Sequence, residues 1–121
     1  MSSKLEDRLK VLRESGIVES SQVRGRIERD EHIYFEIVSQ LTDGSRLYVS
    51  ERWRGEVRLF YAYYWVRDNR VVAGWNNAPH HRDIPTFPHH AHIGGKVLPW
   101  KEADLKEILQ HIKEKGISRR R

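Results

Sequence analysis

The sequence has 121 residues, the length of one ordinary domain, which leaves no room for a second hydrophobic core. It contains no cysteine, which excludes a disulfide scaffold, thiolate catalysis and thiolate zinc sites and is typical of a reducing cytoplasm. The net charge is +5 and 15 of the 22 basic residues are arginine. This charge indicates a protein that binds a polyanion such as nucleic acid about as strongly as it indicates a soluble protein whose surface is merely basic.

The N-terminal segment, from Ser2 to Ser15, has the pattern of an amphipathic helix. Ser3 and Glu6 have the spacing of a capping box, and the leucines at positions 5, 9 and 12 share one face. Gly16 supplies the stop signal. We therefore expect one short helix before the main body of the domain.

From Val18 to Asn76 the apolar residues alternate with polar ones, which is the pattern of β-strands. Turn signals at Asp43-Gly44, in the run 54–56 and in the run 67–70 divide this region into strands at about residues 22–29, 33–37, 47–53, 57–66 and 71–76. Short turns between consecutive strands favour an antiparallel meander. We expect a sheet of five to six strands.

The second helix is expected from Glu102 to Lys115, where apolar residues recur with helical spacing before Gly116. The fold class is therefore α+β, with residues 1–116 as one domain whose terminal helices cover the sheet. A basic tail, residues 117–121, is expected to be disordered. The sequence has neither an apolar run long enough to span a membrane nor a signal peptide, so we expect a cytoplasmic protein.

A long irregular stretch, from Asn77 to Pro99, contains all four prolines and most of the histidines. Five of the seven histidines fall within 13 residues, where an even distribution would place fewer than one: His80, His81, His89, His90 and His92. Imidazole is the side chain that both accepts and donates a proton near neutral pH. This cluster is the strongest candidate for a functional site.

Three interpretations of the cluster remain open. In the first, one histidine is the base and another the acid of RNA cleavage by the 2′-hydroxyl, with no metal or other cofactor. In the second, His90 and His92 together with His80 or His81 bind a zinc-like divalent metal. In the third, the imidazoles only hydrogen-bond the loop and pack against the sheet.

The strand at 57–66 is rich in aromatic residues, and its alternation gives two sets that point in opposite directions. An exposed set beside Arg52 could stack unpaired bases. We expect Phe60 and Tyr64 in the core, and Tyr63 and Trp65 near the histidine loop, where they would position a nucleotide.

Glu51 occupies a position at which the strand pattern calls for an apolar residue. A carboxylate there costs free energy unless it is paired. Glu51 is therefore either a site residue, which orients a histidine or acts as a base itself, or the partner of a nearby arginine. Asn77 and Arg82, in the loop, and Arg52 are the further candidates for binding a substrate; Arg82 would neutralise phosphate.

The run Asn77-Ala78-Pro79-His80-His81, followed by Thr86-Phe87-Pro88-His89-His90-x-His92 and Gly94-Gly95, resembles the TumE family of prokaryotic toxin–antitoxin toxins. The resemblance extends from about Leu47 to the C-terminal helix. Family members often have aspartate where this chain has Asn76. The resemblance implies a small toxin that is held inactive by an antitoxin encoded beside it and that has RNA as its target.

The leading hypothesis is therefore a toxin that acts as a metal-independent endoribonuclease through histidine acid–base catalysis. A metal-dependent nuclease is the nearest alternative. A non-catalytic RNA- or protein-binding module is a third, and a toxin that modifies its target is a fourth that no glycine-rich phosphate loop supports. The sequence leaves homo-oligomerisation open.

Overall fold

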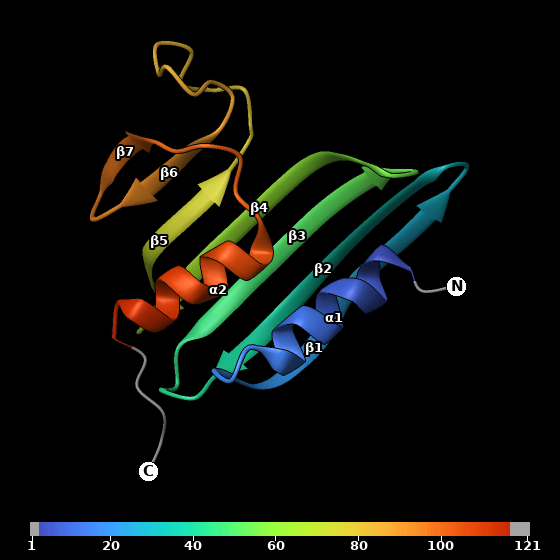
Figure 1. The fold of residues 1–121 in the computed structure, drawn as a ribbon, viewed down its shortest axis with the longest axis horizontal. Helices are drawn as coiled ribbons and strands as arrows, with labels where there is room; N and C mark the ends of the chain where they lie inside the picture. Colours follow the sequence, from blue (N-terminus) through green and yellow to red (C-terminus); the bar gives the residue numbers. More distant parts are fainter. Residues whose placement is uncertain (1–2, 117–121) are drawn as a thin grey trace.

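The computed structural model describes residues 3–116, and these form an antiparallel sheet with both helices on one of its faces (Figure 1). The elements follow the chain in the order α1 (Lys4–Glu14), β1 (Val18–Arg29), β2 (His32–Leu41), β3 (Arg46–Arg54), β4 (Val57–Arg67), β5 (Arg70–Asn76), β6 (His90–Ile93), β7 (Lys96–Pro99) and α2 (Leu105–Glu114). The seven strands of this region lie in chain order as a meander. The predicted α+β class with two terminal helices is confirmed, while the predicted tail, 117–121, lies outside the described residues.

The sheet has more strands than the five or six expected, because part of the predicted irregular stretch is a hairpin. β6 and β7 come from this stretch and are joined by Gly94 and Gly95, whose φ angles are 59° and 78°. Two consecutive residues with positive φ make the hairpin turn whose twist matches that of the strands. The irregular loop is therefore confined to residues 77–89.

Local signals at the helix ends set where the helices begin. Ser3 and Glu6 form the predicted capping box of α1. Asp104 and Glu107 form a second capping box, so α2 begins at Leu105, three residues later than predicted. Neither helix in the described part of the chain is long and apolar enough to cross a membrane.

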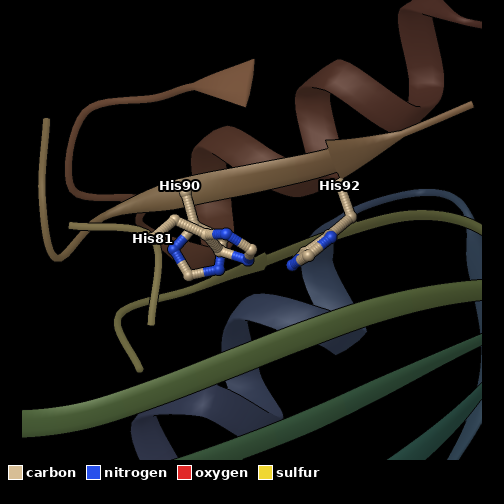
Figure 2. Close-up of side chains that lie close together, drawn as sticks. All are labelled: His81, His90 and His92. Carbon is tan, nitrogen blue, oxygen red and sulfur yellow. The ribbon is translucent and has the colours of Figure 1, made fainter. Parts of the chain in front are cut away.

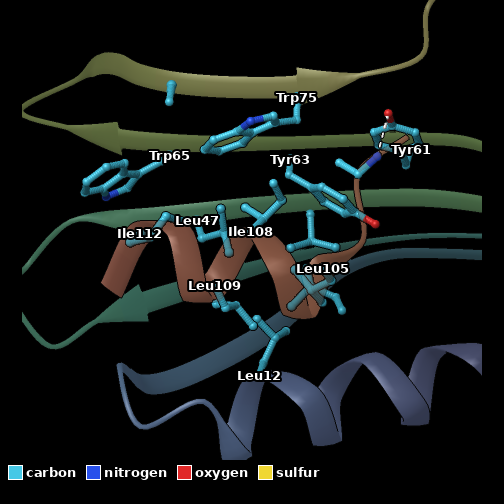
Figure 3. Packing of buried hydrophobic residues seen from close by; sticks show 14 of the residues in the cluster. Leu12, Leu47, Tyr61, Tyr63, Trp65, Trp75, Leu105, Ile108, Leu109 and Ile112 are labelled. Carbon is cyan, nitrogen blue, oxygen red and sulfur yellow. Dashed lines mark hydrogen bonds between the residues drawn. The ribbon is translucent and has the colours of Figure 1, made fainter. Parts of the chain in front are cut away.

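The core lies between the helices and the sheet face that they cover (Figure 3). Its largest fully buried side chains are Trp75, Tyr61 and Tyr63 on the strands. Helix α2 contributes four buried apolar residues to it, and α1 contributes Leu5 and Leu12. Figure 3 shows α2 packed directly beneath the aromatic rings of β4 and β5.

The predicted facing of the aromatic strand is wrong. Tyr63 and Trp65 lie in the core at 0% and 4% exposure, whereas Phe60 and Tyr64 lie on the opposite face and are half-buried. The cause is an irregularity in the β3–β4 pairing: Trp53 pairs with Arg58 but Arg52 pairs with Phe60, so one residue of β4 is unpaired. One extra residue in a strand moves all later side chains to the other face.

The imidazole of His111 on α2 lies among aromatic rings of the core. Its ring centroid is 5.5 Å from Trp75 and 5.4 Å from Trp100, both edge-on. Burial lowers the pKa of His111 below its ordinary value of 6.5, and the nearby Lys115 ammonium lowers it further. The folded protein therefore binds a proton at this site less tightly than the unfolded chain does.

We expect acidification to destabilise the fold through this histidine. Because the folded-state pKa is depressed, the stabilisation is complete above pH 6.5 and is lost as the pH falls through the folded pKa. Urea unfolding at neutral and mildly acidic pH should show a smaller loss of free energy for His111→Gln than for the wild type. Equal losses in the two proteins would contradict this assignment.

Candidate functional site

The irregular loop of residues 77–89, here called the histidine loop, is held to the sheet by its own polar side chains. The Asn77 carboxamide accepts a hydrogen bond from the Tyr61 amide (3.1 Å) and donates one to the Leu59 carbonyl (3.2 Å), which extends the β4 pairing beyond β5. At the far end of the loop, the Thr86 hydroxyl donates to the His89 carbonyl (2.6 Å) and accepts from the Trp100 amide (3.0 Å). Asn77, predicted to bind substrate, thus fixes the start of the loop.

Strand β6 places two histidines on the face that the helices do not cover. Ala91 is fully buried and pairs with Trp75, so it points into the core. Because successive strand residues point to opposite faces, His90 and His92 point away from the core and from the same side of β6 (Figure 2).

His81, from the loop, joins these two histidines (Figure 2). One ring nitrogen of each of the three lies within 4.8 Å of those of the other two. The ring centroids are 4.9 Å (His81–His90), 5.0 Å (His90–His92) and 5.6 Å (His81–His92) apart. We call these three residues the histidine trio.

Two members of the trio, His90 and His92, have well-defined surroundings. His90 is only 3% exposed, and its Nδ1 lies 3.0 Å from the Pro88 carbonyl oxygen. A carbonyl oxygen only accepts hydrogen bonds, so Nδ1 carries a hydrogen and the lone pair of the neutral ring is on Nε2. The pKa of His92 is lowered by burial and then by the imidazoles of His90 and His81.

The other two histidines of the predicted pool lie apart from the trio. His80 is exposed. His89 stacks on Tyr61, with its Nδ1 3.0 Å from the Tyr61 hydroxyl oxygen. That hydroxyl accepts a hydrogen bond from the Ala103 amide (3.1 Å), and burial raises its pKa. Whether the hydroxyl or Nδ1 of His89 is the donor of the bond between them depends on the tautomer of His89. Only three of the five predicted histidines therefore come together.

Glu51 lies on the helix side of the sheet and is fully buried. The Arg8 Nε atom of α1 lies 3.0 Å from both carboxylate oxygens, and the Trp53 indole donates a hydrogen bond of 2.7 Å. The Tyr63 hydroxyl donates to the same carboxylate, and the Arg58 guanidinium lies 3.9 Å from it. Of the two predicted roles, the pairing with an arginine is the one observed.

The buried Tyr63 and Trp65 rings leave no face free for a nucleotide. The Trp65 indole donates to the Ser45 hydroxyl (2.9 Å), and burial followed by the Glu51 carboxylate raises the pKa of Tyr63. Arg82 is exposed in the loop, with its guanidinium 5.9 Å from the Phe87 ring centroid. Arg52 is exposed on the face of the sheet that carries the trio.

Asn76 and its partner Tyr64, both on the face that carries the trio, were not predicted as site residues. Asn76, 4% exposed, donates a hydrogen bond to the Tyr64 hydroxyl (3.0 Å) and accepts one from the Ala78 amide (2.9 Å). Asn76 pairs directly with His90 across β5 and β6. The signal that could have identified it is its position immediately before the histidine motif. An aspartate at this position could accept both hydrogen bonds, with the Tyr64 hydroxyl then acting as donor.

Comparison with known proteins agrees with the motif. No curated protein and no solved structure gives a significant match to the chain. The family described as Toxin TumE matches residues 8–116, which include the second half of α1, the sheet, the histidine loop and α2. The chain therefore belongs to the TumE toxin family.

Proposed function

We propose that this toxin is a cytoplasmic endoribonuclease that cleaves RNA by proton transfer between imidazoles of the histidine trio. The observation that carries the proposal is the convergence of His81, His90 and His92 on the uncovered face of the sheet. General acid–base catalysis needs two titratable groups close together that both work near neutral pH. The trio supplies them, and a binding module has no need of them.

The tautomer of His90 supports its assignment as the base. Its Nε2 lone pair accepts the proton of a ribose 2′-hydroxyl while the 2′-oxygen attacks phosphorus. The bond from phosphorus to the 5′-oxygen then breaks, and that oxygen takes a proton from an imidazolium. The lowered pKa of His92 disfavours its charged form, which leaves His81 as the acid. The products are a 2′,3′-cyclic phosphate and a 5′-hydroxyl.

The other predicted residues take supporting parts in this proposal. Arg82 is adjacent to His81 in the chain and exposed, so it is available to a phosphate. Family membership supports a protein antitoxin as the partner that holds the toxin inactive. Glu51 supports the fold through Arg8 rather than the reaction, because it is buried on the opposite side of the sheet.

A second candidate, a metal-dependent nuclease, is favoured by the same trio. Three neutral imidazoles with an open fourth position are a common donor set for catalytic zinc. A hydrogen bond from the other ring nitrogen to a carbonyl, as His90 makes to Pro88, is a frequent support for such ligands. The two candidates differ in whether the Nε2 lone pair of His90 takes a proton or a metal ion.

We expect untagged protein to cleave a mixed RNA substrate in excess EDTA and to leave cyclic phosphate ends. The products would be separated by gel electrophoresis and their ends identified by mass spectrometry. Cleavage that requires added divalent metal would support the second candidate and overturn the first. Absence of cleavage under both conditions would overturn both and favour a binding or modifying toxin.

A further inference from the structure

In the described part of the chain no helix covers the face of the sheet opposite α1 and α2 (Figure 1), and the histidine loop meets this face at His81. The strand pairing aligns its side chains in rows across the sheet. One row runs from β2 to β6 and contains, in order, Val38, Tyr48, Tyr64, Gly74 and His92. Two tyrosines therefore lie in register with a histidine of the trio.

The Tyr64 ring lies flat on the backbone of Gly74. A Cβ atom at position 74 would lie 2.5 Å from Cδ1 and 2.6 Å from Cε1 of this ring, so only glycine permits the arrangement. The Tyr64 hydroxyl accepts the hydrogen bond from Asn76, which fixes the ring. The Tyr64 side chain is half-buried, so part of it is exposed on the face of the sheet that carries His92.

The charges on this face favour an anion. Arg46 and Arg52 are both exposed on β3, and within residues 3–116 neither makes an ion pair or a side-chain hydrogen bond. The face carries one acidic side chain between β2 and β6, Glu36, which accepts a hydrogen bond from the Tyr34 hydroxyl (2.5 Å). Two unpaired guanidinium groups therefore flank the tyrosine row.

We propose that this face binds an unpaired RNA strand, with a base stacked on Tyr64 and phosphates at Arg46 and Arg52. The proposal rests on the proposed function for its choice of RNA and adds how the substrate is held. Fixed aromatic rings beside arginines recognise unpaired bases, because duplex bases cannot offer their faces for stacking. A base on Tyr64 places the adjoining ribose beside His92 and His90, so Tyr64 is a positioning residue for the trio.

Binding can be measured without cleavage. A fluorescent oligonucleotide that is 2′-O-methylated throughout lacks the attacking hydroxyl, and its anisotropy reports the dissociation constant. We expect Tyr64→Leu to weaken binding about 5- to 100-fold and Tyr64→Phe, which keeps the ring, to weaken it far less. Arg46→Gln and Arg52→Gln should each weaken binding and reduce the salt dependence by about one phosphate contact. Arg13→Gln, on the exposed side of α1, is the matched control.

The outcomes separate this inference from the proposed function. Binding that depends on Tyr64 and the two arginines supports the inference even when no RNA is cleaved. Unchanged binding by folded Tyr64→Leu, Arg46→Gln and Arg52→Gln overturns it, even when the wild type cleaves RNA. Equal affinity for single-stranded and duplex RNA overturns it as well. The inference is also overturned if these variants lose antitoxin binding but keep RNA binding, because this face would then bind the protein partner.

Discussion

Replacement of Glu51 with alanine is expected to lower the free energy of unfolding by about 3–5 kcal/mol, the usual effect of removing one partner of a buried ion pair. The variant deprives Arg8, Trp53 and Tyr63 of their shared acceptor. Trp53 and Tyr63 lie in the core and the Arg8 side chain is only 14% exposed, so little water is at hand to replace the carboxylate. For a domain of this length the melting temperature should fall by roughly 10–20 °C.

The contribution of the Arg8–Glu51 pair can be separated from that of packing. Glu28→Ala is the matched control, since Glu28 pairs with Arg26 at 3.3 Å on the exposed surface and its loss should change the melting temperature little. Combining Glu51→Leu with Arg8→Met should destabilise the protein less than the sum of the single changes. Additive losses, or a Glu51→Ala variant as stable as Glu28→Ala, would show that the buried network does not stabilise the fold.

The layout of the fold could be predicted because each of its signals is local. The capping box at Ser3 and the helical spacing from Leu105 to Ile112 depend on neighbours within one or two turns. The turn residues between strands likewise act within four positions. The hairpin of β6 and β7 was missed although Gly94-Gly95 signals a turn, because its strands have only four residues each.

The facing of β4 could not be predicted, because both alternating sets of its side chains are apolar or aromatic. If β4 paired with β3 without an irregularity after the Gly55-Glu56 turn, Phe60 and Tyr64 would lie on the core side of the sheet. The unpaired residue between Arg58 and Phe60 reverses this, and nothing in the local sequence marks it. The aromatic surface beside the trio is therefore built from Tyr64 and not from Tyr63.

The histidine site was predictable as a segment but not as a set of residues. His89 and His90 are adjacent, and the second begins a strand, so their side chains diverge to Tyr61 and to the trio. His81 reaches the trio through the tertiary path of the loop, which spacing alone does not define. Five histidines are therefore clustered in the sequence, but only three of their imidazoles lie together in the structure.

Replacement of His90 with glutamine is expected to reduce the rate of RNA cleavage about 10²- to 10⁴-fold, the usual contribution of a positioned general base. Glutamine keeps a polar side chain that can donate to the Pro88 carbonyl but has no basic nitrogen. The matched control is His32→Gln, because His32 is exposed at the start of β2 and pairs with Arg54 at the far end of the sheet. Circular dichroism would establish that both variants are folded.

The dependence of the wild-type rate on pH tests the same assignment. A base and an acid that are both imidazoles give a bell-shaped profile, since the base must be free and the acid protonated. Burial, followed by the imidazoles of His90 and His81, lowers the pKa of His92, so this imidazole takes up a proton at a lower pH than an ordinary histidine does. A rate that rises steadily through about pH 8.5 would exclude a second imidazole as the acid. A His90→Gln variant as active as His32→Gln would remove the base from the trio altogether, and with it the reason for placing the scissile phosphate beside Tyr64.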